Sequence, residues 1–158
     1  MKRFEFVEGD EIVIAPGRTV KRIRALVEMV ALGVASGDLG GYIEKESQVY
    51  GNAWVYDSAQ VSGSAMVYGS ARVYGDAQVY GDGLICWFSN VGSEDGTLTI
   101  YNTKDNCIEV TRGCFQGTPE EFLAASAEKH DERIQHEYRL LIEVGISRVT
   151  AARAKEEE

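Results

Sequence analysis

The chain has 158 residues, 44% of them hydrophobic and 26% charged, a composition typical of a soluble globular protein with one sizeable domain. Its formal net charge of −9 argues against nonspecific binding to nucleic acid or to anionic lipid. No apolar run approaches the length of a membrane span and the charged start is unlike a signal peptide, so we expect a cytoplasmic protein.

Residues 1–42 are predicted to form an N-terminal β cap. Apolar residues alternate on both sides of Gly9 and Asp10 within residues 2–14, which predicts a small hairpin with its turn at these two residues. Pro16 and Gly17 predict a second turn.

The stretch 20–30 is compatible with two structures. Ile23, Leu26 and Val27 have helical spacing, but the same run can be a strand that leads into the following segment. We favour the strand. The glycine-rich stretch 37–41 is then expected to bend the chain into a first rung at Ile43.

Residues 49–84 repeat a six-residue pattern, in the blocks VYGNAW, VYDSAQ, VSGSAM, VYGSAR, VYGDAQ and VYGDGL. A strict short period predicts a parallel β-helix, in which each block is one short strand and one turn. Valine and the alanine four residues later point to the same side, the inside. The valines concerned are Val49, Val55, Val61, Val67, Val73 and Val79. Since the register extends back to Ile43 and forward to Val91, we expect about three coils over residues 43–91.

A β-helix leaves unpaired strand edges at its two ends, and these need a cover. The N-terminal hairpin is the natural cover at one end. At the other end, the stretches 97–101 and 107–111 predict the two strands of a β-hairpin within residues 92–117.

Residues 118–158 are predicted to form two C-terminal α-helices and a tail. Thr118 as N-cap, Pro119 at the first position and Glu121 three residues after the cap predict a helix to about His130. Asp131 can cap a second helix. Its apolar stripe comprises Ile134, Tyr138, Leu141, Ile142, Gly145, Ile146 and Val149. The tail 151–158 is expected to be frayed.

The V-Y-G-[ND]-A-x blocks resemble the hexapeptide-repeat proteins, whose fold is a left-handed parallel β-helix and whose usual assembly is a homotrimer. The flanking stretches 22–26, 37–44, 51–55 and 112–118 resemble a group of these proteins that is common in phages and prophages. The resemblance therefore implies a mainly β protein with a short left-handed β-helix. In this chain tyrosine stands directly after the aliphatic residue, where the better-known enzymes have glycine, and this leaves the handedness open.

The enzymes of the resembling family are mostly acyltransferases with a histidine general base, or carbonic anhydrases with three histidines on zinc. This chain has only His130 and His136, both in the predicted C-terminal helices. We therefore expect no catalytic residue, no metal and no cofactor, with an acyltransferase as the alternative.

The chain has three cysteines, Cys86, Cys107 and Cys114, an odd number without CxxC spacing. They predict reduced thiols rather than a disulfide framework or a zinc site. Cys86 and Cys114 have aromatic neighbours and are expected to be packed and inert.

Outward aromatic residues of the repeat are the candidate binding residues. With three blocks to a coil, Tyr50 should stack over Tyr68, Tyr56 over Tyr74, and Trp54 over Arg72. Such ladders either support the rungs and pack between protomers, or they form a ligand surface with Arg72 as its cation. The candidates are Tyr50, Trp54, Tyr56, Tyr68, Arg72, Tyr74 and Tyr80.

The lack of a catalytic base in the repeat favours a non-enzymatic binding protein, and the resemblance implies that it is oligomeric and of phage type. Its partners would be itself, as a homotrimer, and a host protein or a small nucleotide in the host cytoplasm. Inhibition of a bacterial defence system is the expected role. An acyltransferase and a phage structural or scaffold component are the alternatives.

Overall fold

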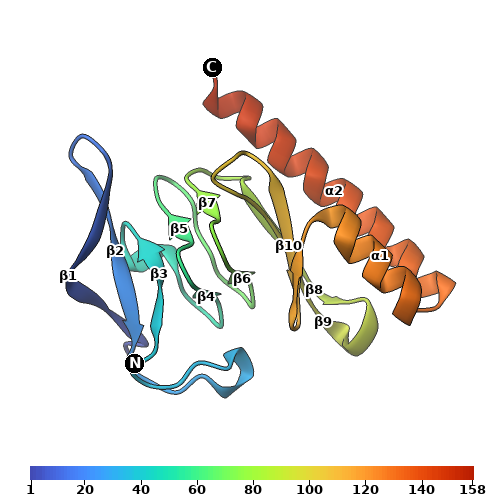
Figure 1. The fold of residues 1–158 in the computed structure, drawn as a ribbon, viewed down its shortest axis with the longest axis horizontal. Helices are drawn as coiled ribbons and strands as arrows, with labels where there is room; N and C mark the ends of the chain where they lie inside the picture. The colour runs from blue at the N-terminus through green and yellow to red at the C-terminus, as the bar shows by residue number, and fades with distance from the viewer.

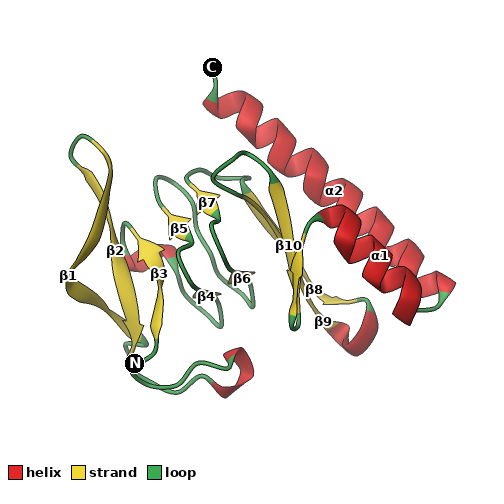
Figure 2. Cartoon of the chain, viewed as in Figure 1, coloured by secondary structure: helices red, strands yellow, loops and turns green.

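Short parallel strands occupy the middle of the molecule, between an N-terminal hairpin and a C-terminal sheet covered by two helices (Figure 1). The computed structural model describes residues 1–158. It is mainly β with two C-terminal helices, as expected, and Figure 2 shows both long helices on one side of the β structure.

The parallel strands form the coils of a β-solenoid. Strands β3 (Leu39–Ile43), β5 (Gln60–Val61) and β7 (Gln78–Val79) pair in parallel on one face. Strands β4 (Trp54–Val55) and β6 (Arg72–Val73) pair on a second face. Each residue pairs with the one 18 positions later, as Val55 does with Val73, so three six-residue blocks make one coil, as predicted.

The interior of the solenoid is the core predicted from the repeat. Its valines and alanines are buried, and they belong to one continuous apolar cluster with residues of the C-terminal sheet and helices. The repeat residues in it are Val49, Ala53, Val55, Ala59, Val61, Ala65, Val67, Ala71, Val73, Ala77 and Val79. Only β-branched and small side chains fill so narrow an interior, because each coil encloses little space.

Glycine holds the corners, with one informative exception. Gly69 and Gly75 have φ of 64° and 65°, in the left-handed region that favours glycine. Asp57 adopts φ 52° at the equivalent corner. Its carboxylate accepts a hydrogen bond from the Gly75 amide of the next coil at 3.0 Å, which ties the two corners together.

The N-terminal hairpin is larger than predicted. Strand β1 (Phe4–Ala15) pairs antiparallel with β2 (Arg18–Ala25) around the turn at Pro16 and Gly17. The expected turn at Gly9 and Asp10 is wrong: these residues form a bulge within β1. Asp10 is held there because its carboxylate accepts hydrogen bonds from Arg22 and Tyr42 of the neighbouring strands.

The strand favoured for the stretch after residue 20 is present as β2, which pairs with β3. The bend expected over the stretch 37–41 is present only at Gly37, which lies in a turn with φ 94°, whereas Gly40 and Gly41 lie inside β3. A Cβ atom at Gly40 would lie 2.7 Å from Ile23 Cγ1, so glycine there permits close packing of the strand on its neighbours. Between β2 and β3, residues 26–38 leave the sheet and include a 3-10 helix, Val30–Leu32. We call residues 26–38 the covering loop.

The solenoid ends earlier than predicted. The expected continuation to Val91 is wrong, because β8 (Ile85–Val91) pairs antiparallel with β9 (Gly96–Asn102). Strands β10 (Ile108–Arg112) and β11 (Phe115–Gly117) complete a four-stranded antiparallel sheet in the order β11-β10-β9-β8. The two strands of the hairpin predicted within 92–117 are thus β9 and β10, the two central strands of this sheet.

Both predicted helices are present. Helix α1 (Pro119–Lys129) begins with the Thr118 capping box, and α2 (Glu132–Glu156) begins with Asp131 as N-cap. The prediction of a frayed tail over residues 151–158 is wrong, because α2 continues to Glu156. Arg153 fastens it by donating to Asn102 Oδ1 at 2.6 Å and to the Cys107 carbonyl at 2.7 Å. Neither helix has both the length and the apolar character needed to cross a membrane.

Candidate functional site

Two pairs of stacked tyrosines stand on the solenoid, as predicted. The ring centroids of Tyr50 and Tyr68 are 4.9 Å apart and those of Tyr56 and Tyr74 are 4.1 Å apart, with 7° between the ring planes in each pair. The spacing follows from the fold, because residues one coil apart are separated by about the 4.8 Å between paired strands.

The pair Tyr56 and Tyr74, which we call the covered ladder, is not a free surface. The Tyr56 hydroxyl donates to the Leu32 carbonyl of the covering loop at 2.8 Å. Arg72 donates to the Ala31 carbonyl of the same loop at 2.5 Å. Burial raises the pKa of the Tyr56 phenol, and the neighbouring Tyr74 adds to this shift. Tyr56 and Arg72 therefore hold the covering loop against the solenoid, and Tyr74 stacks on Tyr56.

The pair Tyr50 and Tyr68 is open, and Trp87 extends it. Tyr50 is 46% exposed and Tyr68 42% exposed. The Trp87 ring meets Tyr68 edge-to-face with centroids 4.5 Å apart. A Cβ atom at Gly69 would lie 3.0 Å from Trp87 Nε1, so the corner glycine lets the indole lie close to the coil. We call Tyr50, Tyr68 and Trp87 the bare ladder.

Trp87 was missed by sequence reasoning because it lies after the last block of the repeat. Position 86 would follow Tyr68 by one coil, and Trp87 is one residue further on, in the antiparallel strand β8. The aromatic residue at position 87, next to the position where the ladder would continue, was the sequence signal that could have identified Trp87.

Trp54 occupies the core rather than the surface. It pairs in register with Arg72, as predicted, but its expected outward position is wrong, because the indole is fully buried. Phe4 of β1 packs edge-to-face on it at 6.0 Å. The N-terminal strand, which lies far away in sequence, is what buries this residue.

A cavity of about 310 Å³ lies at the N-terminal end of the bare ladder. Its lining includes Tyr50 and residues 1–4 but neither Tyr68 nor Trp87, so it adjoins the side of Tyr50 away from Tyr68. Arg3 donates to the Ala53 carbonyl at 3.0 Å, while its Nη1 is buried without a partner. Burial lowers the pKa of this guanidinium.

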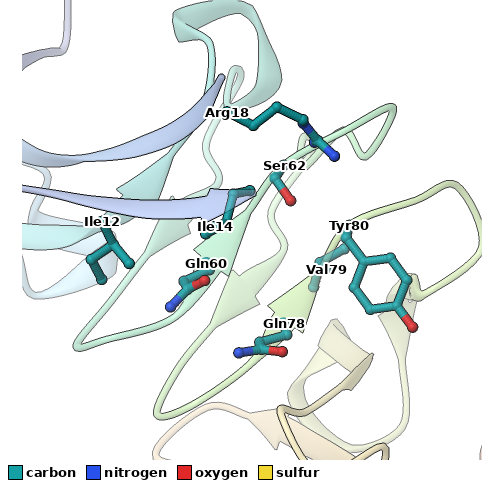
Figure 3. A pocket seen from close by; sticks show the side chains of 8 residues that line it. All are labelled: Ile12, Ile14, Arg18, Gln60, Ser62, Gln78, Val79 and Tyr80. Atoms are coloured by element: carbon teal, nitrogen blue, oxygen red, sulfur yellow. The ribbon is translucent and has the colours of Figure 1, made fainter. Parts of the chain in front are cut away.

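Tyr80 belongs to neither ladder and lines a groove of about 430 Å³ on the outer face of the five-stranded sheet β1-β2-β3-β5-β7. In Figure 3, Gln60 and Gln78 project from neighbouring strands below the hairpin residue Ile14. The lining residues are Ile12, Ile14, Arg18, Gln60, Ser62, Gln78, Val79 and Tyr80.

The one charged side chain of this groove is neutralised. Arg18 donates to both carboxylate oxygens of Glu44, at 3.0 and 2.9 Å. These bonds, together with one from the Gly63 amide, lower the pKa of Glu44 to about 2. The groove therefore presents amide and hydroxyl groups without a net charge.

The histidines and cysteines are dispersed. His130 ends α1 with its Nδ1 2.9 Å from Ser126 Oγ, and His136 is exposed on α2. Burial raises the pKa of the Cys86 thiol to about 11. The expected packing of Cys114 is wrong, because this residue is exposed at the β10–β11 turn. No group of three or more His, Cys, Asp or Glu side chains lies close enough together to hold a metal ion.

Comparison with known proteins identifies the repeat. Residues 47–63 and 59–75 match a family model described as the YdcK beta solenoid repeat. The matched residues include both stacked tyrosine pairs and the parallel strands β4 and β6. No curated protein matches the chain. The match and the pairing together support a β-solenoid repeat protein.

Proposed function

We propose that this protein is a non-enzymatic binding protein, and that the bare ladder anchors a partner protein. One observation carries the proposal. The chain covers one of its two tyrosine ladders with its own loop and leaves the other, extended by Trp87, open to solvent. Tyr and Trp are among the residues that most often dominate the binding energy at protein interfaces, and here Tyr50 and Tyr68 are exposed with Trp87 partly buried beside them.

The geometry of the ladder favours a protein over a nucleic acid strand. Tyr50 and Tyr68 are already stacked on each other, so no base fits between them. The net charge of −9 opposes a polyanion. The hydroxyls of Tyr50 and Tyr68 form no hydrogen bond within the chain, so they are available to a polar group of the partner.

The finer features expected from the resemblance belong to the same proposal. The solenoid is of the left-handed hexapeptide type, and three chains assemble with the bare ladder lining the groove between protomers, where it stays open to the partner. A phage-encoded protein that inhibits a bacterial defence component would use the surface in this way. Light scattering checks the assembly, with three times the mass of one 17.4 kDa chain as the expected result.

Site-specific photocrosslinking tests the proposal. The photoreactive residue p-benzoylphenylalanine replaces Tyr50 in the full chain, produced in its native cell, and replaces Tyr80 in a matched control. Both sites are tyrosines of the solenoid, but only Tyr50 belongs to the bare ladder. We expect a discrete adduct with one other protein from position 50 and none from position 80.

Three outcomes contradict the proposal. An adduct with a second copy of the chain alone makes the ladder an interface between protomers. Equal adducts from the two positions show that the ladder has no special role. Retention of a small molecule without any protein adduct assigns the open side of Tyr50 to a planar ligand instead.

A further inference from the structure

A second cavity, of about 400 Å³, lies between the β10–β11 hairpin, the turn after β8 and the C-terminal end of α1. It shares no residue with the bare ladder. Its aromatic wall is formed by Phe115, Phe122 and Tyr138, which meet edge-to-face with centroids 5.3 and 4.9 Å apart. Cavities of this size are typical of sites for small molecules.

Arg112 stands in the wall of this cavity without a counterion. Its guanidinium packs over the backbone of Gly96 and donates to the Ser93 carbonyl. Its Nε is buried and has no acceptor. No carboxylate lies within ion-pair distance of Arg112, whereas Arg22 meets Asp10 at 3.1 Å. A partly buried guanidinium without a carboxylate partner is a group that an anion in the cavity would stabilise.

Two further nitrogen-bearing side chains line the cavity beside Arg112. Lys129, in the last turn of α1, forms no ion pair. His130 uses Nδ1 for the contact with Ser126 Oγ, so its other ring nitrogen is available. Glu94 is the only carboxylate of the lining. In a chain with a net charge of −9, Arg112 and Lys129 against Glu94 reverse the sign of charge at this place.

We infer that this cavity binds a small molecule that combines an aromatic ring with one anionic group, a carboxylate or a phosphate. The ring packs on Phe115 and Phe122, and the anionic group receives hydrogen bonds from Arg112 and Lys129. The inference is independent of the bare ladder, so either site can exist without the other.

Two exposed cysteines can be used to test the inference by alkylation. Cys114 lines the cavity and Cys107 lies outside it, so one molecule carries both the reporter and its control. The full chain is alkylated with neutral iodoacetamide in the presence of phenyl phosphate, benzoate or uncharged benzyl alcohol. Mass spectrometry of the two cysteine-containing peptides measures the alkylation rate of Cys114 and that of Cys107.

We expect phenyl phosphate or benzoate to slow alkylation of Cys114 several-fold while that of Cys107 is unchanged. Arg112→Gln should raise the ligand concentration that gives half-maximal protection at least about tenfold, because a charge-assisted hydrogen bond is lost. Arg148→Gln removes an exposed charge of α2 outside the cavity and should leave the protection of Cys114 unchanged. If Arg112→Gln does not fold, Lys129→Gln is the second variant, with an expected loss of a few-fold.

The ligands separate the outcomes. Protection by only one of the two anions supports the site and assigns its anionic group. Equal protection by benzyl alcohol shows a merely apolar cavity and overturns the inference. Absence of protection by both anions overturns it as well, and so does equal weakening by Arg148→Gln.

Discussion

The two tyrosine ladders have the same 18-residue spacing and the same 7° between ring planes, yet only one of them is exposed. The repeat itself determines how the rings stack. Whether a ladder is covered depends on the covering loop, which is not part of the repeat and reaches the solenoid from residues 26–38. A repetitive core can therefore carry chemically similar surfaces with different roles.

The difference extends to stability. Tyr56 of the covered ladder and the neighbouring Arg72 each donate one hydrogen bond to a backbone carbonyl of the covering loop, at Leu32 and Ala31. Tyr50 and Tyr68 of the bare ladder donate no hydrogen bond to such a loop and are nearly half exposed, so their rings bury less surface than those of the covered ladder when the chain folds. We expect changes in the covered ladder to affect folding and changes in the bare ladder to affect binding.

The largest difference in stability is expected between substitutions at two consecutive residues of one coil, one pointing inward and one outward. Val67 is fully buried and the next residue, Tyr68, is exposed. Val67→Asp should abolish cooperative folding, because an unpaired buried charge costs several kcal/mol, comparable to the whole stability of a domain. Tyr68→Asp should change stability by less than about 1 kcal/mol. Thermal unfolding by circular dichroism measures both, and near-wild-type melting of Val67→Asp would contradict the solenoid core.

The next effect separates the two ladders directly. Tyr56→Ala should destabilise the chain by about 2–4 kcal/mol, because it removes a half-buried ring and its hydrogen bond to Leu32. Tyr50→Ala should cost at most about 1 kcal/mol. Urea unfolding of the two variants gives the comparison. Equal losses would show that exposure does not distinguish the ladders.

A smaller effect is expected at the covering loop itself. Arg72→Ala removes one hydrogen bond to the Ala31 carbonyl and should cost about 1 kcal/mol. Amide exchange of residues 29–34 should accelerate while that of the solenoid valines stays slow. Arg148→Ala is the matched control, since Arg148 is exposed on α2. Unchanged exchange at residues 29–34 would show that Arg72 does not hold the loop.

The smallest effect is expected from acid, which weakens the sheet that carries the covering loop. The Arg18 guanidinium and the Gly63 amide lower the pKa of Glu44 from 4.5 to about 2. Because the folded state favours the carboxylate, this stabilisation is present above pH 4.5 and is mostly lost when the pH falls to about 2.

Glu44→Gln should therefore lower the melting temperature at pH 6 but hardly at pH 2. A difference from the wild type that is the same at both pH values would contradict the role of the Arg18–Glu44 pair.

The repeat was predictable to the level of single residues because its period fixes the neighbours. Once three blocks make a coil, the burial of Val67 and the stacking of Tyr50 on Tyr68 follow from the sequence alone. The capped starts of α1 and α2 were equally local, since Thr118 and Asp131 bond within their own first turns.

The errors come from contacts between distant segments. Trp54 is buried by Phe4, and the helix end near Arg153 is fastened to Asn102. Ile85 fits the repeat register, but it pairs with Tyr101 of the antiparallel sheet. No local pattern encodes such contacts. The same holds for the candidate site, where the covering loop decides which predicted aromatic residues stay exposed.

The most direct test of the account measures how tightly the partner identified by crosslinking at position 50 binds to Tyr50→Ala and to Tyr56→Ala. Calorimetric titration is done where both variants are folded. We predict that Tyr50→Ala weakens binding by about 1–3 kcal/mol, whereas Tyr56→Ala stays within about twofold of the wild type. Normal binding by Tyr50→Ala together with weakened binding by Tyr56→Ala would contradict the assignment of the bare ladder as the binding surface.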